Sequence, residues 1–138
     1  MIKLITPDTL QQILIKQLSQ LETLNELLYI EYQLLNAGKV DLLRLNDVTE
    51  KKQYWLTVLS HSEEQRITSS AQCGCPLPYQ QDNALAPIWQ KIEALIKQLY
   101  QINSQNGLLL KQHMQINQQQ LTFLKKCHSP TLMVNIVK

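Results

Sequence analysis

A long heptad pattern in the C-terminal half is the feature that most constrains how this chain can fold. From Ile88 to Ile116, apolar residues recur at alternating spacings of four and three, and polar Asn106 and His113 occupy two of the same positions. This spacing gathers the side chains along one side of an α-helix, as in a coiled coil. It predicts one continuous helix over about residues 85–127, roughly 60 Å long at about 1.5 Å per residue.

Two shorter helices are expected before it. Thr6-Pro7-Asp8 is typical of a helix start and Ala37-Gly38 of a helix end, so the leucine-rich stretch between them predicts a helix over about residues 7–37. Asp41 can cap a second helix over about residues 41–68, and the short joint makes that helix an antiparallel neighbour of the first. Because both are shorter than the third helix, part of the third helix should overhang the bundle.

Between the second and third helices the apolar periodicity fails over about residues 69–83, which predicts a linker. Residues 129–138 are expected to form a flexible C-terminal tail. The chain, residues 1–138, should therefore be a single all-α domain, an antiparallel, coiled-coil-like three-helix bundle with a long third helix. The apolar positions predicted for the core are Leu10, Leu14, Leu18, Leu21, Leu24, Leu27, Leu28, Tyr32 and Leu35 in the first helix, and Leu42, Leu45, Val48, Trp55, Leu56, Leu59 and Ile67 in the second.

The composition narrows the class of partner. The chain is 44% hydrophobic and 17% charged, with only 3 Gly and 5 Pro, which favours helices. Its net charge is +2 and its basic residues are scattered, so nucleic acid is not an expected partner. No stretch approaches the ~20 apolar residues that cross a bilayer, and the N-terminus lacks the pattern of a secretory signal. We expect a cytoplasmic protein without membrane insertion.

No motif for catalysis or for a cofactor is evident. The three histidines lie far apart in the sequence, and the carboxylates, including Glu22, Glu26 and Glu31, are interpreted as solvent-facing charge. Four soft metal ligands occur as Cys73-x-Cys75 and Cys127-His128, but the long third helix separates the two pairs by far more than a zinc site allows. The sequence therefore predicts neither an enzyme nor a metal or cofactor site.

Two features leave alternatives open. Asn106-Gly107 falls inside the heptad pattern, where Asn106 either is buried and fixes the register of the helix or forms, with Gly107, a notch for a partner's backbone. From Leu108 onward the apolar residues spread beyond one seam, which indicates either a surface for another protein or self-association. Trp55 and Trp89 are interpreted as core anchors, with contact to a partner as the alternative.

Several short motifs resemble the FlgN family of flagellar type III export chaperones. The resemblance is strongest over residues 89–132 and is weaker across the first two helices, where a leucine-rich helix, a glycine at position 38 and Leu42-x-x-Leu45 followed by Glu50-Lys51 are similar. The motifs that carry it are Trp89-Gln90-x-Ile92, Ile102-Asn103-x-x-Asn106-Gly107-x-Leu109-Leu110, Asn117-Gln118-Gln119-x-Leu121-x-x-Leu124-Lys125 and Pro130-Thr131-Leu132.

The resemblance implies a cytoplasmic chaperone, which we expect to be a monomer. Such a chaperone binds the C-terminal helical segments of the hook-associated proteins FlgK and FlgL, prevents their premature assembly and delivers them to the export apparatus. The implied client-binding residues are Asn106, Gly107, Leu109, Leu110, Met114, Asn117, Leu121 and Leu124. The resemblance also implies docking to the export gate FlhA through Pro130, Thr131, Leu132 and Met133, with other export components as further partners. Relatives continue Pro-Thr-Leu with an aromatic residue and a glycine, whereas this chain has Met133-Val134 there.

The alternative is a structural or adaptor protein that self-assembles as a coiled coil. In that case the heptad seam of the third helix would meet a symmetry mate, and Asn106 and His113 would set the register of the oligomer.

Overall fold

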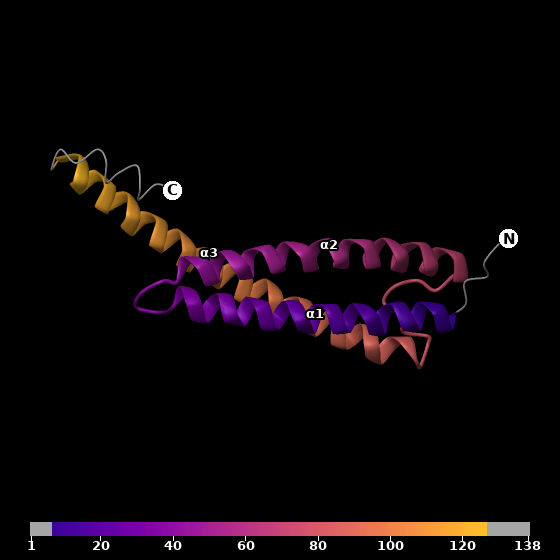
Figure 1. Ribbon diagram of the computed structural model, residues 1–138. Helices are drawn as coiled ribbons and strands as arrows, with labels where there is room; N and C mark the ends of the chain where they lie inside the picture. The colour runs from indigo at the N-terminus through magenta and orange to yellow at the C-terminus, as the bar shows by residue number, and fades with distance from the viewer. Residues whose placement is uncertain (1–6, 127–138) are drawn as a thin grey trace.

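The computed structural model describes residues 7–126, with side chains described for residues 9–116 and 118–122. It consists of three α-helices, namely α1 (Pro7–Leu35), α2 (Leu42–Cys73) and α3 (Leu85–Lys126), shown in Figure 1. The predicted all-α class is confirmed. None of these described helices is long and apolar enough to span a membrane.

The chain runs up, down and up again, so that α1 and α3 are parallel to each other and antiparallel to α2 (Figure 1). Helix α1 is central because it packs closely against both of the other helices. Helices α2 and α3 reach each other through long side chains, such as Lys52 and Arg66 of α2. The result is the predicted three-helix bundle, with its two outer helices splayed around α1.

Two hydrogen bonds hold the parallel helices α1 and α3 in a fixed register. The side chain of Asn106 bonds the carbonyl oxygen of Leu28, and the side chain of His113 bonds the carbonyl oxygen of Leu35. Both pairs are 78 residues apart in the sequence. Because the two contacts lie one heptad apart on each helix, the seam predicted on the third helix packs against α1, as a parallel coiled coil would.

The apolar core lies mainly between α1 and α3. The predicted core leucines of α1 are buried or half-buried, and α3 contributes residues from its heptad seam. Trp55, Leu59 and Trp89 are partly buried and pack against this cluster, which matches the core-anchor interpretation of the two tryptophans. The buried cluster consists of Leu10, Leu14, Leu21, Leu24, Leu28, Tyr79, Leu85, Ile92 and Leu99.

Helix α2 differs from the prediction in what it buries. Of its predicted core residues Val48 is buried, whereas the side chains of Leu42, Leu56 and Ile67 are exposed. The C-terminal half of α2 instead faces the bundle with polar residues, and its buried residues there are Ser62, Arg66 and Ser69. These follow a helical spacing of four and three, so the helix continues although its apolar periodicity does not.

That polar face explains why α2 ends at Cys73 and not near residue 68 as predicted. Gly74 adopts a left-handed conformation, with φ of 67°, and its N–H bonds the carbonyl oxygen of Ser70. Glycine adopts such angles without steric cost, and a residue in this conformation commonly ends a helix. The N-terminal end of α2 agrees with the prediction, because the side chain of Asp41 accepts a hydrogen bond from the backbone N–H of Arg44 at 3.2 Å.

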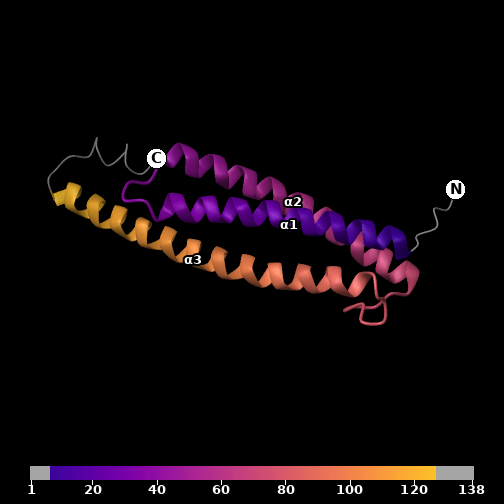
Figure 2. The same ribbon diagram turned by 90° about the horizontal axis from the view of Figure 1, so that it is seen from below.

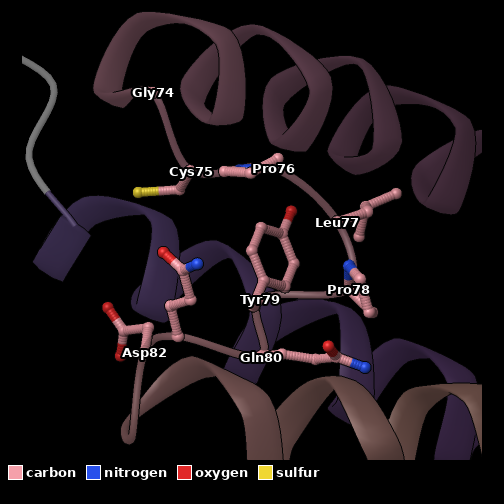
Figure 3. Close-up of a pocket in the computed structure, with 9 residues that line it drawn as sticks. Gly74, Cys75, Pro76, Leu77, Pro78, Tyr79, Gln80 and Asp82 are labelled. Carbon is pink, nitrogen blue, oxygen red and sulfur yellow. The ribbon is translucent and has the colours of Figure 1, made fainter.

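The connection from α2 to α3 is held in place by Tyr79. Its phenol points from the loop toward α2 (Figure 3), where the hydroxyl bonds Arg66 Nη1 at 2.9 Å and Ser70 Oγ at 2.5 Å. Its ring packs edge-on against Trp89 of α3, with 5.6 Å between ring centroids. The loop encloses a hollow of about 340 Å³ beside these contacts. Asp82 then caps α3 by accepting hydrogen bonds from two backbone N–H groups, those of Ala84 and Leu85.

The far end of α3 extends past the end of α1. His113 contacts the carbonyl oxygen of Leu35, the last residue of α1, so residues 114–126 of α3 lie beyond that helix (Figure 2). Thirteen helical residues measure about 20 Å. The overhang that the sequence predicts is therefore present, and we refer to residues 114–126 as the overhang.

Candidate protein-binding surface

Asn106 lies at the base of the exposed part of α3 and faces inward. Its side chain is 2% exposed, and Nδ2 donates hydrogen bonds to the carbonyl oxygen of Leu28 and to Glu31 Oε1, both at 2.8 Å. Of the two interpretations of Asn106, the structure shows the buried residue that fixes helix register. Because α1 covers this side chain, Asn106 is set apart from the exposed residues of α3, and its role in client binding stays a prediction.

Glu31 connects all three helices at this level. Besides accepting from Asn106 of α3, its Oε1 lies 3.5 Å from Lys52 Nζ of α2, and Lys52 donates a hydrogen bond to Asn103 Oδ1 at 2.7 Å. Glu31 is 7% exposed, so its interpretation as solvent-facing charge was wrong. A buried carboxylate requires such partners, because removing one of them leaves an uncompensated charge at a cost of about 3–5 kcal/mol.

The burial of Glu31 could have been found from the spacing of α1. Leu24, Leu28, Glu31 and Leu35 lie four, three and four residues apart, which places Glu31 in the heptad seam itself. Sequence reasoning missed it because charged residues are usually assigned to the solvent face. No sequence spacing indicates that Lys52 and Asn103 lie near Glu31, since that proximity depends on how the helices pack.

A second polar cluster joins α1, α2 and the loop at the opposite end of the bundle. Arg66 forms an ion pair with Glu63, and Gln17 Nε2 of α1 donates to Glu63 Oε2 at 3.0 Å. Burial raises the pKa of Glu63, but the hydrogen bonds from Arg66 and Gln17 and the charge of Arg66 outweigh burial, so this pKa lies below its ordinary value. The hydrogen bond to Glu63 correspondingly raises the pKa of Arg66. Glu63 is therefore a carboxylate at neutral pH, bound between two helices.

The exposed apolar side chains of α3 form a stripe beside the seam that packs on α1. Gly107, Leu110, Met114 and Leu121 are three, four and seven residues apart, so they lie on nearly the same side of a helix with 3.6 residues per turn. Leu110 is 45% exposed and Met114 is 62% exposed, while Leu121 is half-buried. A Cβ atom added at Gly107 would meet nothing within 4 Å, so the missing side chain leaves a shallow depression in the stripe.

The stripe lies on the flank of α3 that faces the α2 side of the bundle. Asn103 precedes Gly107 by four residues and shares this flank, and its side chain bonds Lys52 of α2. Leu109 is half-buried because it belongs to the seam facing α1. The structure thus brings together Gly107, Leu110, Met114 and Leu121 of the predicted client residues and separates Asn106 and Leu109 from them.

Some predicted site residues cannot be placed in this way. The backbone of Asn117 and Leu124 is helical and in phase with the stripe, but their side chains lie outside the described ones. Pro130, Thr131, Leu132 and Met133 lie outside the described residues, as does the predicted tail that contains them. Among the described side chains from Leu108 onward, Leu108 and Ile116 are exposed apolar residues that were not predicted as client contacts, and they lie away from the stripe.

The cysteines Cys73 and Cys75 lie where α2 meets the loop, and both are free and half-buried. A hydrogen bond with Cys73 and burial raise the pKa of the Cys75 thiol to about 11, which leaves it a poor nucleophile at neutral pH. Among the described side chains, no group of three or more His, Cys, Asp or Glu residues is placed to hold a metal ion. Cys127 and His128 lie outside the described residues.

Comparison with known proteins supports the resemblance seen in the motifs. The family model "FlgN protein" matches residues 1–133. A protein of Proteus mirabilis named "Flagella synthesis protein FlgN" is 44% identical over 125 residues, which cover 91% of this chain and 86% of that protein. Proteins of the same name from Yersinia enterocolitica and Salmonella typhimurium are 37% and 32% identical, over 91% and 89% of this chain and 85% and 84% of theirs. No solved structure matches the chain.

Proposed function

Because the chain belongs to the FlgN family, we propose that it is a cytoplasmic export chaperone for the hook-associated proteins FlgK and FlgL. It binds their C-terminal helical segments, prevents their premature assembly and delivers them to the flagellar type III export apparatus. No catalytic step is required, because the task is to cover an apolar helical surface and later release it.

The observation that carries this proposal is the exposed apolar stripe on a helix that extends beyond its own bundle. Leu110 and Met114 expose about half or more of their surface, and α1 ends before it could cover the overhang. An amphipathic client helix can lay its apolar face against such a stripe, as helix-in-groove complexes do. Met114 suits this role because its flexible thioether adapts to different client side chains.

The binding must also be reversible. A stripe of a few apolar residues at the edge of one helix offers a smaller and less enclosed surface than an obligate interface, which buries roughly 2,000 Å² or more. We therefore propose moderate affinity, with the client released at the export gate. Docking to FlhA through Pro130, Thr131, Leu132 and Met133 remains a prediction from the family resemblance.

The self-assembling coiled coil is less well supported. That alternative requires the heptad seam of α3 to face a symmetry mate, yet the seam packs on α1 as far as His113. Asn106 and His113 therefore set the register within one chain. Self-association through the exposed stripe is a separate possibility, which light scattering tests, since a concentration-independent monomer excludes it.

Co-purification tests the proposed function directly. The full chain should retain full-length FlgK and FlgL but not variants that lack the C-terminal helical segment. Equal retention of full-length and truncated clients would count against the proposed binding mode. An unrelated protein of similar size, used in place of this chain, serves as the control for nonspecific apolar contact.

A further inference from the structure

Helix α3 carries a second heptad-spaced row of residues beside the seam that packs on α1. Its spacings are four, three, four, three and four, which is the pattern of a coiled-coil seam. Only the C-terminal part of this row, from Gly107 to Met114, belongs to the predicted client surface. Tyr100, which does not, is 75% exposed, and Ile96 is 46% exposed. The row consists of Ile96, Tyr100, Asn103, Gly107, Leu110 and Met114.

Helix α2 presents a matching row toward the same space. Its spacings are three, four, three, four and three, and its orientation is fixed by Lys52, which bonds Asn103 of α3. Leu42 and Leu56 of this row are exposed. The row consists of Leu42, Leu45, Thr49, Lys52, Leu56 and Leu59.

We refer to the space between the two rows, over α1, as the groove. At the level of Ile96 the groove contains a cavity of about 270 Å³. Its lining is apolar at Leu21, Leu59, Trp89, Ile92 and Ile96 and polar at Gln17, Ser60 and Glu63. The cavity is mostly apolar and large enough for side chains of another protein. The splay of α2 and α3 around α1 thus leaves a position at which a fourth helix would complete a bundle.

Charge is almost absent from these rows. Their one charged member, Lys52, is paired with Glu31, and the other members are apolar or uncharged polar residues. Depletion of charged residues distinguishes the cores of protein interfaces from ordinary surface. The groove is also continuous with the client stripe, because Gly107, Leu110 and Met114 belong to both.

We propose that the client helix does not bind the stripe alone but enters the groove between α2 and α3 and completes a four-helix bundle. This inference rests on the proposed chaperone function, and it places Ile96, Tyr100 and Leu56 in the client interface. The occupant is an amphipathic helix with apolar residues at heptad spacing. From Ile96 to Met114 the row would contact about 27 Å of that helix, at about 1.5 Å per residue.

The pair formed by Lys52 and Asn103 divides the groove into two apolar halves. A polar layer in a coiled coil fixes the register of the partner, because an apolar side chain placed there leaves polar groups unpaired. The client helix should therefore carry a polar residue at this level, with apolar residues one heptad on either side.

The test measures binding of a fluorescent synthetic peptide that covers the C-terminal helical segment of FlgK. The variants are Ile96→Asp and Tyr100→Asp in the groove, Met114→Asp in the overhang, and Tyr54→Asp as a matched control. Tyr54 is 63% exposed like the others but lies on the far side of α2, two residues from Lys52. Circular dichroism establishes that each variant is folded, which exposed positions should permit.

We expect Ile96→Asp and Tyr100→Asp to raise Kd at least tenfold, as Met114→Asp does, while Tyr54→Asp changes it less than threefold. If only Met114→Asp weakens binding, the groove inference is overturned and the proposed function stands. If the unaltered protein does not bind the peptide, both fail. If the protein is a dimer that Tyr100→Asp converts to a monomer, a second copy occupies the groove and the inference is likewise overturned.

Discussion

The imidazole Nε2 of His113 lies 2.6 Å from the carbonyl oxygen of Leu35, the last residue of α1. A carbonyl oxygen can only accept, so Nε2 carries the proton and donates. The final carbonyls of a helix lack partners within it, and this bond from α3 satisfies one of them. The same contact marks the level at which α3 leaves the bundle and becomes the overhang.

Replacing His113 with alanine should therefore destabilise the bundle modestly. We expect His113→Ala to lower the free energy of unfolding by about 0.5–1.5 kcal/mol, the usual contribution of one hydrogen bond. Urea denaturation followed by circular dichroism measures it. Gln112→Ala, at the exposed neighbouring position, should leave the midpoint almost unchanged, and equal effects of the two substitutions would contradict the capping role.

Asn106 should matter more than His113, because its loss affects a buried charge. Asn106→Ala removes both hydrogen bonds of Nδ2 and leaves Glu31 without its closest partner. We expect a loss of about 2–4 kcal/mol in the free energy of unfolding. The exposed Gln105→Ala is the matched control in the same denaturation experiment. A loss below about 0.5 kcal/mol would be typical of a surface site and would show that the network contributes little.

The pKa of Glu63 predicts a specific dependence of stability on pH. Because this pKa is lower in the folded state, Glu63 contributes stability that is fully present above its unfolded-state pKa of about 4.3. That contribution is lost as pH falls through the lower folded-state value, since the protonated side chain no longer pairs with Arg66.

Thermal unfolding between pH 7 and pH 3 tests this. Glu63→Gln should be less stable than the unaltered protein at pH 7, and the difference should shrink as the pH falls below about 4.3. Glu64→Gln, at an exposed neighbouring position, should show no such convergence. A difference that stays constant with pH would mean that the charge of Glu63 does not contribute.

The division of α3 into bundle and overhang predicts the effect of shortening the chain. A variant that ends at Gln115 keeps the contact between His113 and Leu35 and loses most of the overhang. We expect its unfolding temperature to remain within about 4 °C of the full chain, which corresponds to roughly 1 kcal/mol for a domain of this size. Its affinity for FlgK should fall at least tenfold. Loss of the folded state would show instead that the overhang contributes to the bundle.

The three helices and the seam on which α1 and α3 meet can be predicted from the amino-acid sequence. The helices and the seam depend on the spacing of apolar residues along one segment, which is a local property. The heptad positions from Ile88 to His113 lie on one side of a helix, whichever residues pack against them. The ends of α1, the cap at Asp41 and the existence of an overhang followed from equally local signals. The motifs within α3 were specific enough to indicate the family.

Which polar residues are buried, and what they bind, depends on how the helices pack. Glu31 and Asn106 lie 75 residues apart in the sequence yet share a hydrogen bond, and Lys52 of a third helix pairs with Glu31. The polar face of α2 at Ser62 and Arg66 concealed both its burial and its continuation to Cys73 from a pattern based on apolar residues. Burial of a polar group is favourable only when its partners are present, and those partners are supplied by packing between segments distant in the sequence.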